Sequence, residues 1–228
     1  MVSKVIFRLD KKRDIWNCLD TLKHRRVFGL QWDIDSKLLA KIKGKNQNKA
    51  KQIIIEFASQ RYKKEYEDLN RVLRSFESSW RTIEKKYFRR LEQTLQKPIC
   101  AKTFYACLTT LSSRCPWLYY KKGWMVFYER TPEAILRTCA HELLHMQFKR
   151  WHQRMCLKYL NWKQKEHLRE ALTFLLNEKE FIDLIPIRDY GYPAHQKLRA
   201  KFSEEWHKTR DFNKFLPKAI GITKRMVK

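Results

Sequence analysis

Two histidines and a glutamate in the segment TCAHELLHMQFKRW, residues 138–151, have the types and spacing of a metal centre. His141 and His145 are four residues apart, so on an α-helix their side chains point the same way, with Cβ atoms about 5–6 Å apart. Two imidazole nitrogens at that separation can bind one zinc ion, whose Zn–N bonds are about 2.0–2.1 Å long. Glu142 can reach a water molecule beside the ion, which is the position of a general base.

The residues before the motif predict the helix that this geometry requires. Thr131 is a suitable N-cap, Pro132 fits the first helical position and Glu133 fits the first turn, so we expect a helix from Pro132 to about Arg154. An H-E-x-x-H pattern arises by chance on the order of once in a hundred chains of this composition. The helical context therefore strengthens the interpretation as a metal site.

The chain resembles the HExxH zinc metallopeptidases over about residues 103–200. AHELLH carries the specific part of the likeness, and the aromatic segments before it and REALTFLLN after it carry a weaker part. The chain is most similar to the gluzincin group, in which a glutamate on a later helix is the third zinc ligand. The metzincin pattern is absent, because Trp151 stands six positions after His145 where that pattern has a histidine.

This resemblance implies a fold, a reaction and a cofactor. The fold expected is α+β and mainly helical, with a small antiparallel sheet next to the HExxH helix. The reaction expected is hydrolysis of a peptide or protein substrate by water activated on Zn²⁺, with Glu142 as the general base. His141 and His145 would be two of the metal ligands.

Three residues are candidates for the third ligand. Glu170 lies 25 residues beyond His145 and is favoured, while Glu166, one helical turn earlier, and His167 remain alternatives.

The residues that support the metal ligands are expected to differ from those of the larger gluzincins. Those enzymes carry a carboxylate about one turn after the glutamate ligand, where this chain has Thr173 and Phe174. Thr173 or Asn177 is therefore expected to replace that carboxylate.

Two further roles follow from the resemblance. Tyr192 or His195, in RDYGYPAHQKLR, is expected to stabilise the oxyanion of the tetrahedral intermediate, although Tyr192 could instead anchor the loop. The strand Met125–Tyr128 is expected to be a sheet edge that pairs with the substrate, with an internal strand as the alternative.

Periodicity predicts how the rest of the chain is organised. Apolar residues recur every three or four positions over 55–95, which indicates one long amphipathic helix or two helices that share a face. We expect a helical N-terminal region over 1–98 and the zincin-like domain over 99–228. Residues 3–9 fit a short strand, and two more short strands are expected around Lys121–Gly123.

The charge is strongly basic but evenly spread. The 228 residues include 50 Lys and Arg against 24 Asp and Glu, a net charge of +26, and residues 1–98 and 99–228 each hold 25 basic and 12 acidic residues. Such a balance favours nucleic acid, anionic membrane surfaces or acidic proteins as partners, but its even spread equally fits a solvated basic surface. A nucleic-acid partner therefore stays open.

The sequence further predicts a cytoplasmic protein with no membrane insertion. No apolar run approaches the roughly 20 residues that span a bilayer, and the N-terminus lacks the apolar segment of a signal peptide. The six cysteines form no C-x-x-C pair, which fits reduced thiols rather than a thiolate zinc site.

Three alternative functions remain. One is a nucleic-acid-associated SprT-like protease, a group that uses histidine as the third ligand. Another is a regulatory protease of the ImmA/IrrE type that cuts a specific repressor. The third is a basic, non-enzymatic binding protein in which the HExxH pattern holds no metal.

Overall fold

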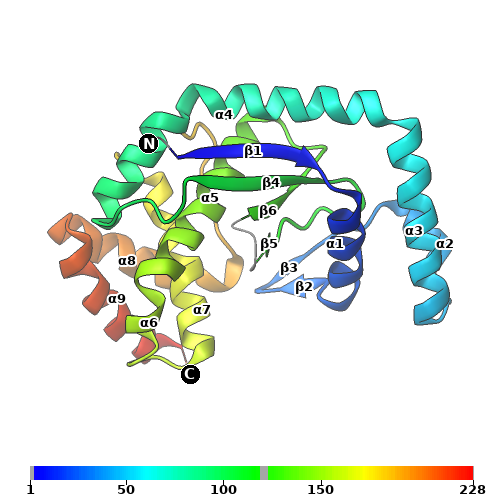
Figure 1. Cartoon of the computed structure of the whole chain (residues 1–228). Coiled ribbons are helices and arrows are strands. Elements are labelled where there is room, and N and C mark those ends of the chain that lie inside the picture. The colour runs from blue at the N-terminus through cyan, green and yellow to red at the C-terminus, as the bar shows by residue number, and fades with distance from the viewer. Residues whose placement is uncertain (1–2, 119–122, 228) are drawn as a thin grey trace. The chain divides into compact units, whose positions relative to one another are not determined.

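The computed structural model describes residues 3–118 and 123–227. It is an α+β structure composed mostly of helices, which confirms the predicted class (Figure 1). The elements in chain order are β1 (Lys4–Leu9), α1 (Lys11–Lys23), β2 (Arg26–Val27), β3 (Leu30–Gln31), α2 (Ser36–Ile42), α3 (Gln47–Lys64), α4 (Tyr66–Leu95), β4 (Thr103–Thr109), β5 (Trp117–Leu118), β6 (Gly123–Phe127), α5 (Pro132–Trp151), α6 (Gln153–Cys156), α7 (Trp162–Ala171), η1 (Leu172–Asn177), η2 (Pro193–His195), α8 (Gln196–Thr209) and α9 (Phe212–Met226).

The main sheet is mixed, so the predicted antiparallel sheet is wrong. Its order is β1-β4-β6-β5, and both β1 and β6 run parallel to β4, while β5 is antiparallel to β6. The expected strand over residues 3–9 is β1, and it pairs with β4 from Lys4 opposite Thr103 to Leu9 opposite Leu108. Helices connect β1 to β4, which makes a parallel pairing accessible.

The expected pair of short strands after Pro98 is present as β5 and β6, and the connection over 119–122 lies outside the described residues. Among the described strands, β6 has β4 on one side and β5 on the other. The register of β5 reaches only Gly123 and Trp124, and the Met125 amide donates to the Pro116 carbonyl. The prediction that Met125–Tyr128 forms a sheet edge therefore stays a prediction.

The long amphipathic segment forms two helices. α3 ends at Lys64 and α4 begins at Tyr66, with Glu65 leaving the helical conformation between them. The apolar stripe of α4 is buried at Leu69, Phe76 and Trp80. These side chains of the stripe are therefore packed inside the protein.

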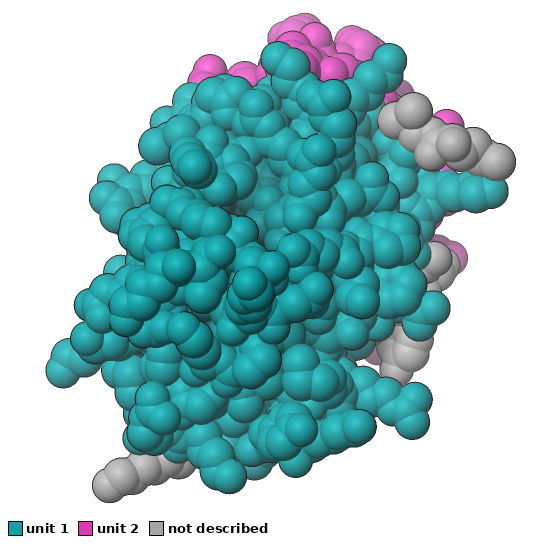
Figure 2. Space-filling model, turned by 90° about the vertical axis from the view of Figure 1, so that its left-hand side faces the viewer, with its two compact units in different colours: residues 1–3, 83–102, 136–228 teal, residues 4–82, 103–135 magenta. Residues whose placement is uncertain are grey.

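The chain divides into two compact units, which Figure 2 colours separately. Unit 1 comprises residues 1–3, 83–102 and 136–228, and unit 2 comprises 4–82 and 103–135. Each unit contains residues from before and after residue 98, where the sequence suggested a domain boundary. The reason is that β1 pairs with β4, while the last turns of α4 belong with the segment after residue 136.

Unit 2 holds the main sheet and the helices α1, α2 and α3. A cluster of buried apolar residues joins these helices: Cys18, Ile34, Leu38, Ile42, Ile54, Ala58 and Leu111. Buried polar groups fasten α1 to the residues that follow β4. The Asp14 carboxylate accepts hydrogen bonds from the hydroxyls of Thr109 and Thr110, both at 2.7 Å.

Unit 1 is helical and contains most of α5 at its centre. The α5 residues Ala140, Leu143, Leu144 and Phe148 are all buried, so this helix is covered on several sides. The Tyr87 hydroxyl donates a 2.6 Å hydrogen bond to the Ala140 carbonyl and ties the end of α4 to α5. The candidate metal ligands all lie within this unit. None of the described helices is both long enough and apolar enough to span a bilayer.

Candidate metal centre

The helix α5 carries the HExxH residues as the sequence predicted. Its start is fixed by Thr131, whose hydroxyl accepts a hydrogen bond from the Ala134 amide, and by Pro132 in the first helical position. The helix ends at Trp151, about one turn earlier than expected. His141 and His145 are successive on one face, with ring centroids 4.4 Å apart.

The third member of the group comes from α7. Asn161 and Gln164 form a capping box that fixes the start of this helix, and Glu170 is near its end. One Glu170 oxygen, Oε2, lies 3.1 Å from His145 Nε2 and 3.6 Å from His141 Nε2. The three prospective ligand atoms lie within 4.8 Å of one another.

These distances suit a tetrahedral zinc ion. Two ligand atoms bound about 2.0–2.1 Å from such an ion lie roughly 3.4 Å apart, between the two distances from Glu170 Oε2. Two imidazole nitrogens and one carboxylate oxygen are also a ligand set that zinc accepts in catalytic sites, with a fourth position left for water or substrate. The side chains present therefore fit the group that the sequence implied.

The two rival third ligands point elsewhere. The Glu166 carboxylate forms ion pairs with Lys165 and Arg169. The His167 ring packs against His195, with centroids 4.9 Å apart. Neither belongs to the group of three ligand atoms, so among the described residues Glu170 is the acid that faces both histidines of the motif.

Arg169 binds one oxygen of Glu170 and leaves the other to face the two histidines. Its Nη2 donates a 2.6 Å hydrogen bond to Glu170 Oε1, which leaves Oε2 facing the histidines. Burial alone would raise the Glu170 pKa, but the positive charge of Arg169 and the contact with His145 hold that pKa well below its usual range. The carboxylate is therefore ionised at neutral pH and oriented for a single bond to a cation.

A carboxylate that the sequence reading missed lies behind His141. Asp189 Oδ2 is 2.7 Å from His141 Nδ1, so a proton on Nδ1 leaves the lone pair of Nε2 directed at the ligand group. Burial would raise the Asp189 pKa, yet His141 and Arg199 lower it to about 2. A carboxylate thus contacts one of the motif histidines, and it comes from a loop 19 residues after Glu170.

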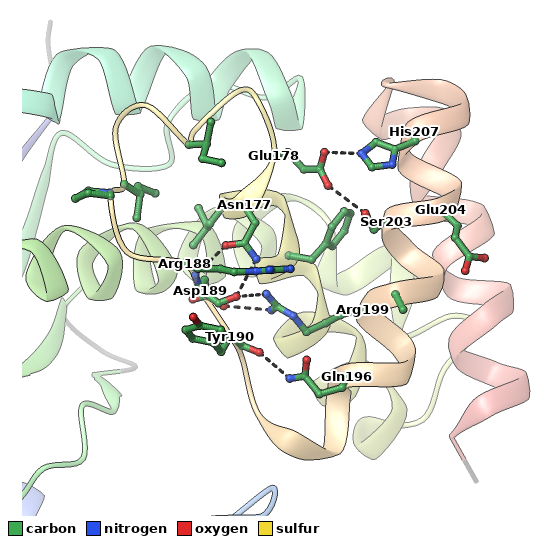
Figure 3. A pocket seen from close by; sticks show the side chains of 16 residues that line it. Asn177, Glu178, Arg188, Asp189, Tyr190, Gln196, Arg199, Ser203, Glu204 and His207 are labelled. Atoms are coloured by element: carbon green, nitrogen blue, oxygen red, sulfur yellow. Dashed lines mark hydrogen bonds and ion pairs between the residues drawn. The ribbon is translucent and has the colours of Figure 1, made fainter.

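The loop that carries Asp189 is held by side chains from its surroundings (Figure 3). Asn177 donates to the Asp189 carbonyl at 2.9 Å and accepts from the Asp189 amide at 2.8 Å. The Thr173 hydroxyl donates to Asp189 Oδ1 at 3.0 Å, and the Arg199 guanidinium forms an ion pair with the same oxygen at 3.2 Å. Thr173 and Asn177 therefore act through Asp189 and do not replace it.

The loop passes close to Arg199 at Gly191. Gly191 has φ +63°, in the left-handed region, and a Cβ atom at this position would lie 2.7 Å from Arg199 Nη1. A side chain at position 191 would therefore strain the backbone and require Arg199 to shift.

The surroundings raise the pKa of Glu142 and lower the pKa of His145. Burial raises the pKa of the Glu142 carboxyl to about 7, and the neighbouring Glu170 charge adds to the effect. Burial also lowers the His145 pKa to about 3, with Arg169 acting in the same direction. A carboxyl near neutrality can accept and return a proton, and a neutral imidazole can bind a cation.

The structure places Tyr192 and His195 together but outside the ligand group. The Tyr192 ring packs against the His195 ring with centroids 5.7 Å apart, and His195 is completely buried. Burial lowers the His195 pKa to about 4, so this ring is neutral at physiological pH. Their predicted role at an oxyanion remains a prediction.

A cavity of about 880 Å³ lies beside the supporting residues (Figure 3). Asn177, Asp189 and Arg199 line it, together with exposed Arg188 and Tyr190. The three prospective ligands do not line this cavity. It therefore adjoins the groups that contact His141 and not the prospective ligands themselves.

Comparisons with known proteins identify no relative. No family model matches the chain, and no curated protein or solved structure is significantly similar to it. The functional argument consequently rests on the residues and their geometry alone.

Proposed function

We propose that this chain is a zinc-dependent metallopeptidase with a zincin-like catalytic unit. The observation that carries the proposal is the convergence of His141 Nε2, His145 Nε2 and Glu170 Oε2 within 4.8 Å, with the HExxH glutamate beside them. When bound, zinc supplies a Lewis acid that lowers the pKa of water and polarises a carbonyl group. His141, His145 and Glu170 would hold it.

Glu142 has the properties of the proton carrier in peptide hydrolysis. Its carboxylate accepts a proton from the attacking water and then returns that proton to the leaving amine. A pKa of about 7 suits both steps, because the group is neither too weak a base nor too weak an acid near neutral pH.

Asp189 supports the site by fixing the orientation of the His141 ring. Its hydrogen bond to Nδ1 keeps the proton on the nitrogen that faces away from Glu170. Arg169 has the matching effect on Glu170, since it occupies Oε1. Each of these two ligands is thus held by an ionic partner on the side opposite the ligand group.

The third ligand also bears on the SprT-like alternative. That group uses a histidine in this position, whereas here a glutamate faces the two motif histidines and His167 packs against His195. The geometry therefore favours the gluzincin-like arrangement.

The proposal is tested with Glu142→Gln and with metal analysis. Wild-type protein purified without chelators should contain close to one zinc per chain and cleave an unfolded protein substrate. Glu142→Gln should retain the zinc, because the residue is not a ligand, and lose most of the hydrolysis. Glu170→Ala should lose zinc, whereas Glu166→Ala should keep it. Undiminished turnover by Glu142→Gln would exclude the mechanism.

A further inference from the structure

One end of unit 1 gathers exposed apolar side chains. Leu157, Tyr159 and Trp162 lie in and beside the turn between α6 and α7, with exposed fractions of 38%, 59% and 56%. Successive backbone hydrogen bonds, such as that from the Tyr159 amide to the Cys156 carbonyl, hold this turn in shape. The apolar groups are therefore presented by an ordered turn that is braced on α6 and α7.

The C-terminal end of α9 joins the same end of the unit. The Gln164 side chain, in the first turn of α7, donates a 2.7 Å hydrogen bond to the Val227 carbonyl. This bond brings Met226, which is 44% exposed, to the side of the α6–α7 turn. Figure 1 shows the α6–α7 turn and the C-terminal end of α9 at the same end of unit 1. We call Leu157, Tyr159, Trp162 and Met226 the apolar tip.

The charged residues in the two segments that carry the apolar tip are all basic. Residues 149–165 and 212–227 contain ten Lys and Arg and no Asp or Glu. Five of these side chains are exposed and form no ion pair with any described residue: Arg154, Lys158, Lys163, Lys224 and Arg225. Glu166, just beyond the segment, is already neutralised by Lys165 and Arg169. Nearby acidic side chains therefore do not neutralise the positive charge of these two segments.

The combination of side chains distinguishes between two kinds of polyanion. Single-stranded nucleic acid stacks its bases on aromatic rings, so Tyr159 and Trp162 could serve it, but aliphatic Leu157 and Met226 could not. A bilayer surface uses all four, because aliphatic groups enter the boundary of the acyl chains while Trp and Tyr lie at the head groups. Lysine stems can extend along the apolar groups and place their ammonium groups among lipid phosphates. The composition favours lipid.

We propose that this end of unit 1 binds the surface of an anionic membrane. The apolar tip enters the head-group region, and the exposed cations around it contact anionic lipid head groups. This mode of binding needs no spanning helix, and it is independent of the proposed peptidase activity.

Vesicle sedimentation with the full chain tests the proposal. Vesicles of phosphatidylcholine with 30% phosphatidylglycerol should bind the protein at least tenfold more tightly than pure phosphatidylcholine vesicles, and raising the salt concentration should weaken the binding. Tyr159→Ser with Trp162→Ser should reduce binding tenfold or more, as should Lys158→Glu with Lys163→Glu. Brominated lipids should quench tryptophan fluorescence, and Trp162→Phe should remove most of that quenching.

Matched controls come from exposed residues of unit 2. Trp16→Ser with Ile55→Ser changes two exposed apolar side chains, and Lys45→Glu with Lys51→Glu changes two exposed lysines. Both controls should bind vesicles within twofold of wild type, and all variants should unfold at similar temperatures.

Three results would overturn the proposal. One is equal or absent binding to anionic and neutral vesicles. Another is loss of binding in the lysine variant alone, with no quenching, which would indicate a purely electrostatic contact. The third is that Tyr159→Ser with Trp162→Ser abolishes binding of a single-stranded oligonucleotide but leaves vesicle binding intact, which would assign the surface to nucleic acid.

Discussion

Replacing Asp189 with asparagine changes the hydrogen bonding of His141 while keeping the shape of the side chain. In the wild type, a carboxylate oxygen of Asp189 lies 2.7 Å from His141 Nδ1. The Asn oxygen can still accept from Thr173 and Arg199, so the amide NH₂ of the variant takes the place of that carboxylate oxygen against Nδ1. A donor in that position forces the ring proton onto Nε2, the nitrogen that faces Glu170. His141 must then give up its favoured tautomer to bind a metal ion.

The expected loss of zinc affinity is tenfold to a hundredfold, about 1.4–2.7 kcal/mol, which is typical when a group that orients a metal ligand is removed. The same substitution leaves the Arg199 guanidinium, which is 6% exposed, without its anionic partner. Breaking a buried ion pair from one side costs about 3–5 kcal/mol, and we expect the low end because Arg199 keeps its contacts with the Thr173 hydroxyl and the Asp189 carbonyl.

A second variant separates these two effects. Arg199→Met combined with Asp189→Asn removes both charges, so it should recover much of the lost stability and still bind zinc weakly. Zinc affinity is measured by competition with a chelator, and stability by urea unfolding of the zinc-free protein. If Asp189→Asn binds zinc as tightly as wild type does, then Asp189 does not orient a metal ligand and the assignment of His141 loses its support.

Three smaller predictions concern single contacts. Gly191→Ala should lower stability by more than Gly44→Ala does. Both positions have positive φ, so at each of them an alanine costs about 1–2 kcal/mol for the left-handed backbone. Only the Cβ at 191 would also contact Arg199, so equal losses of stability would contradict the argument. Tyr87→Phe should cost about 1 kcal/mol in urea unfolding, because it removes the buried hydrogen bond to Ala140, and should leave zinc affinity unchanged. Burial raises the Asp14 pKa above 3.8, so folding favours the protonated form. The stability of wild type relative to Asp14→Asn should therefore fall as pH rises above about 4, and a rise would refute this.

The parts of the site that could be predicted from sequence are those fixed by local rules. Thr131 and Pro132 set the start of α5, and the i,i+4 spacing then places His141 and His145 on one face. Glu170 could be predicted as a ligand because a second helix follows α5 at a short distance and offers few acidic residues. Each of these inferences needs only helix geometry and the identity of nearby residues.

Asp189 could not be predicted in this way. It approaches His141 because the chain bends over residues 178–189 and is clamped there by Asn177 and Arg199. No local pattern encodes that path, and one aspartate before Gly191 has many ordinary explanations. The parallel pairing of β1 with β4 was missed for a similar reason, since the two strands are about a hundred residues apart and strand sequence does not specify direction.

The arrangement of buried charges supports the proposal that this cluster holds a cation. Buried ion pairs contribute little net stability, so a cluster kept only for stability would pair each acid with a base and leave no lone pairs facing one another. Here Arg169 occupies the outer oxygen of Glu170, and Asp189 occupies the outer nitrogen of His141. The inner atoms of Glu170, His141 and His145 then converge. Burial alone would lower the His141 pKa, but the Asp189 charge and the hydrogen bonds to Asp189 and Glu170 raise it to about 10, so without a metal ion His141 is protonated. Such convergence is unfavourable unless a proton or a metal ion lies between the atoms. A bound zinc ion would take the place of the His141 proton, and the three ligand atoms near zinc-binding distances support that proposal.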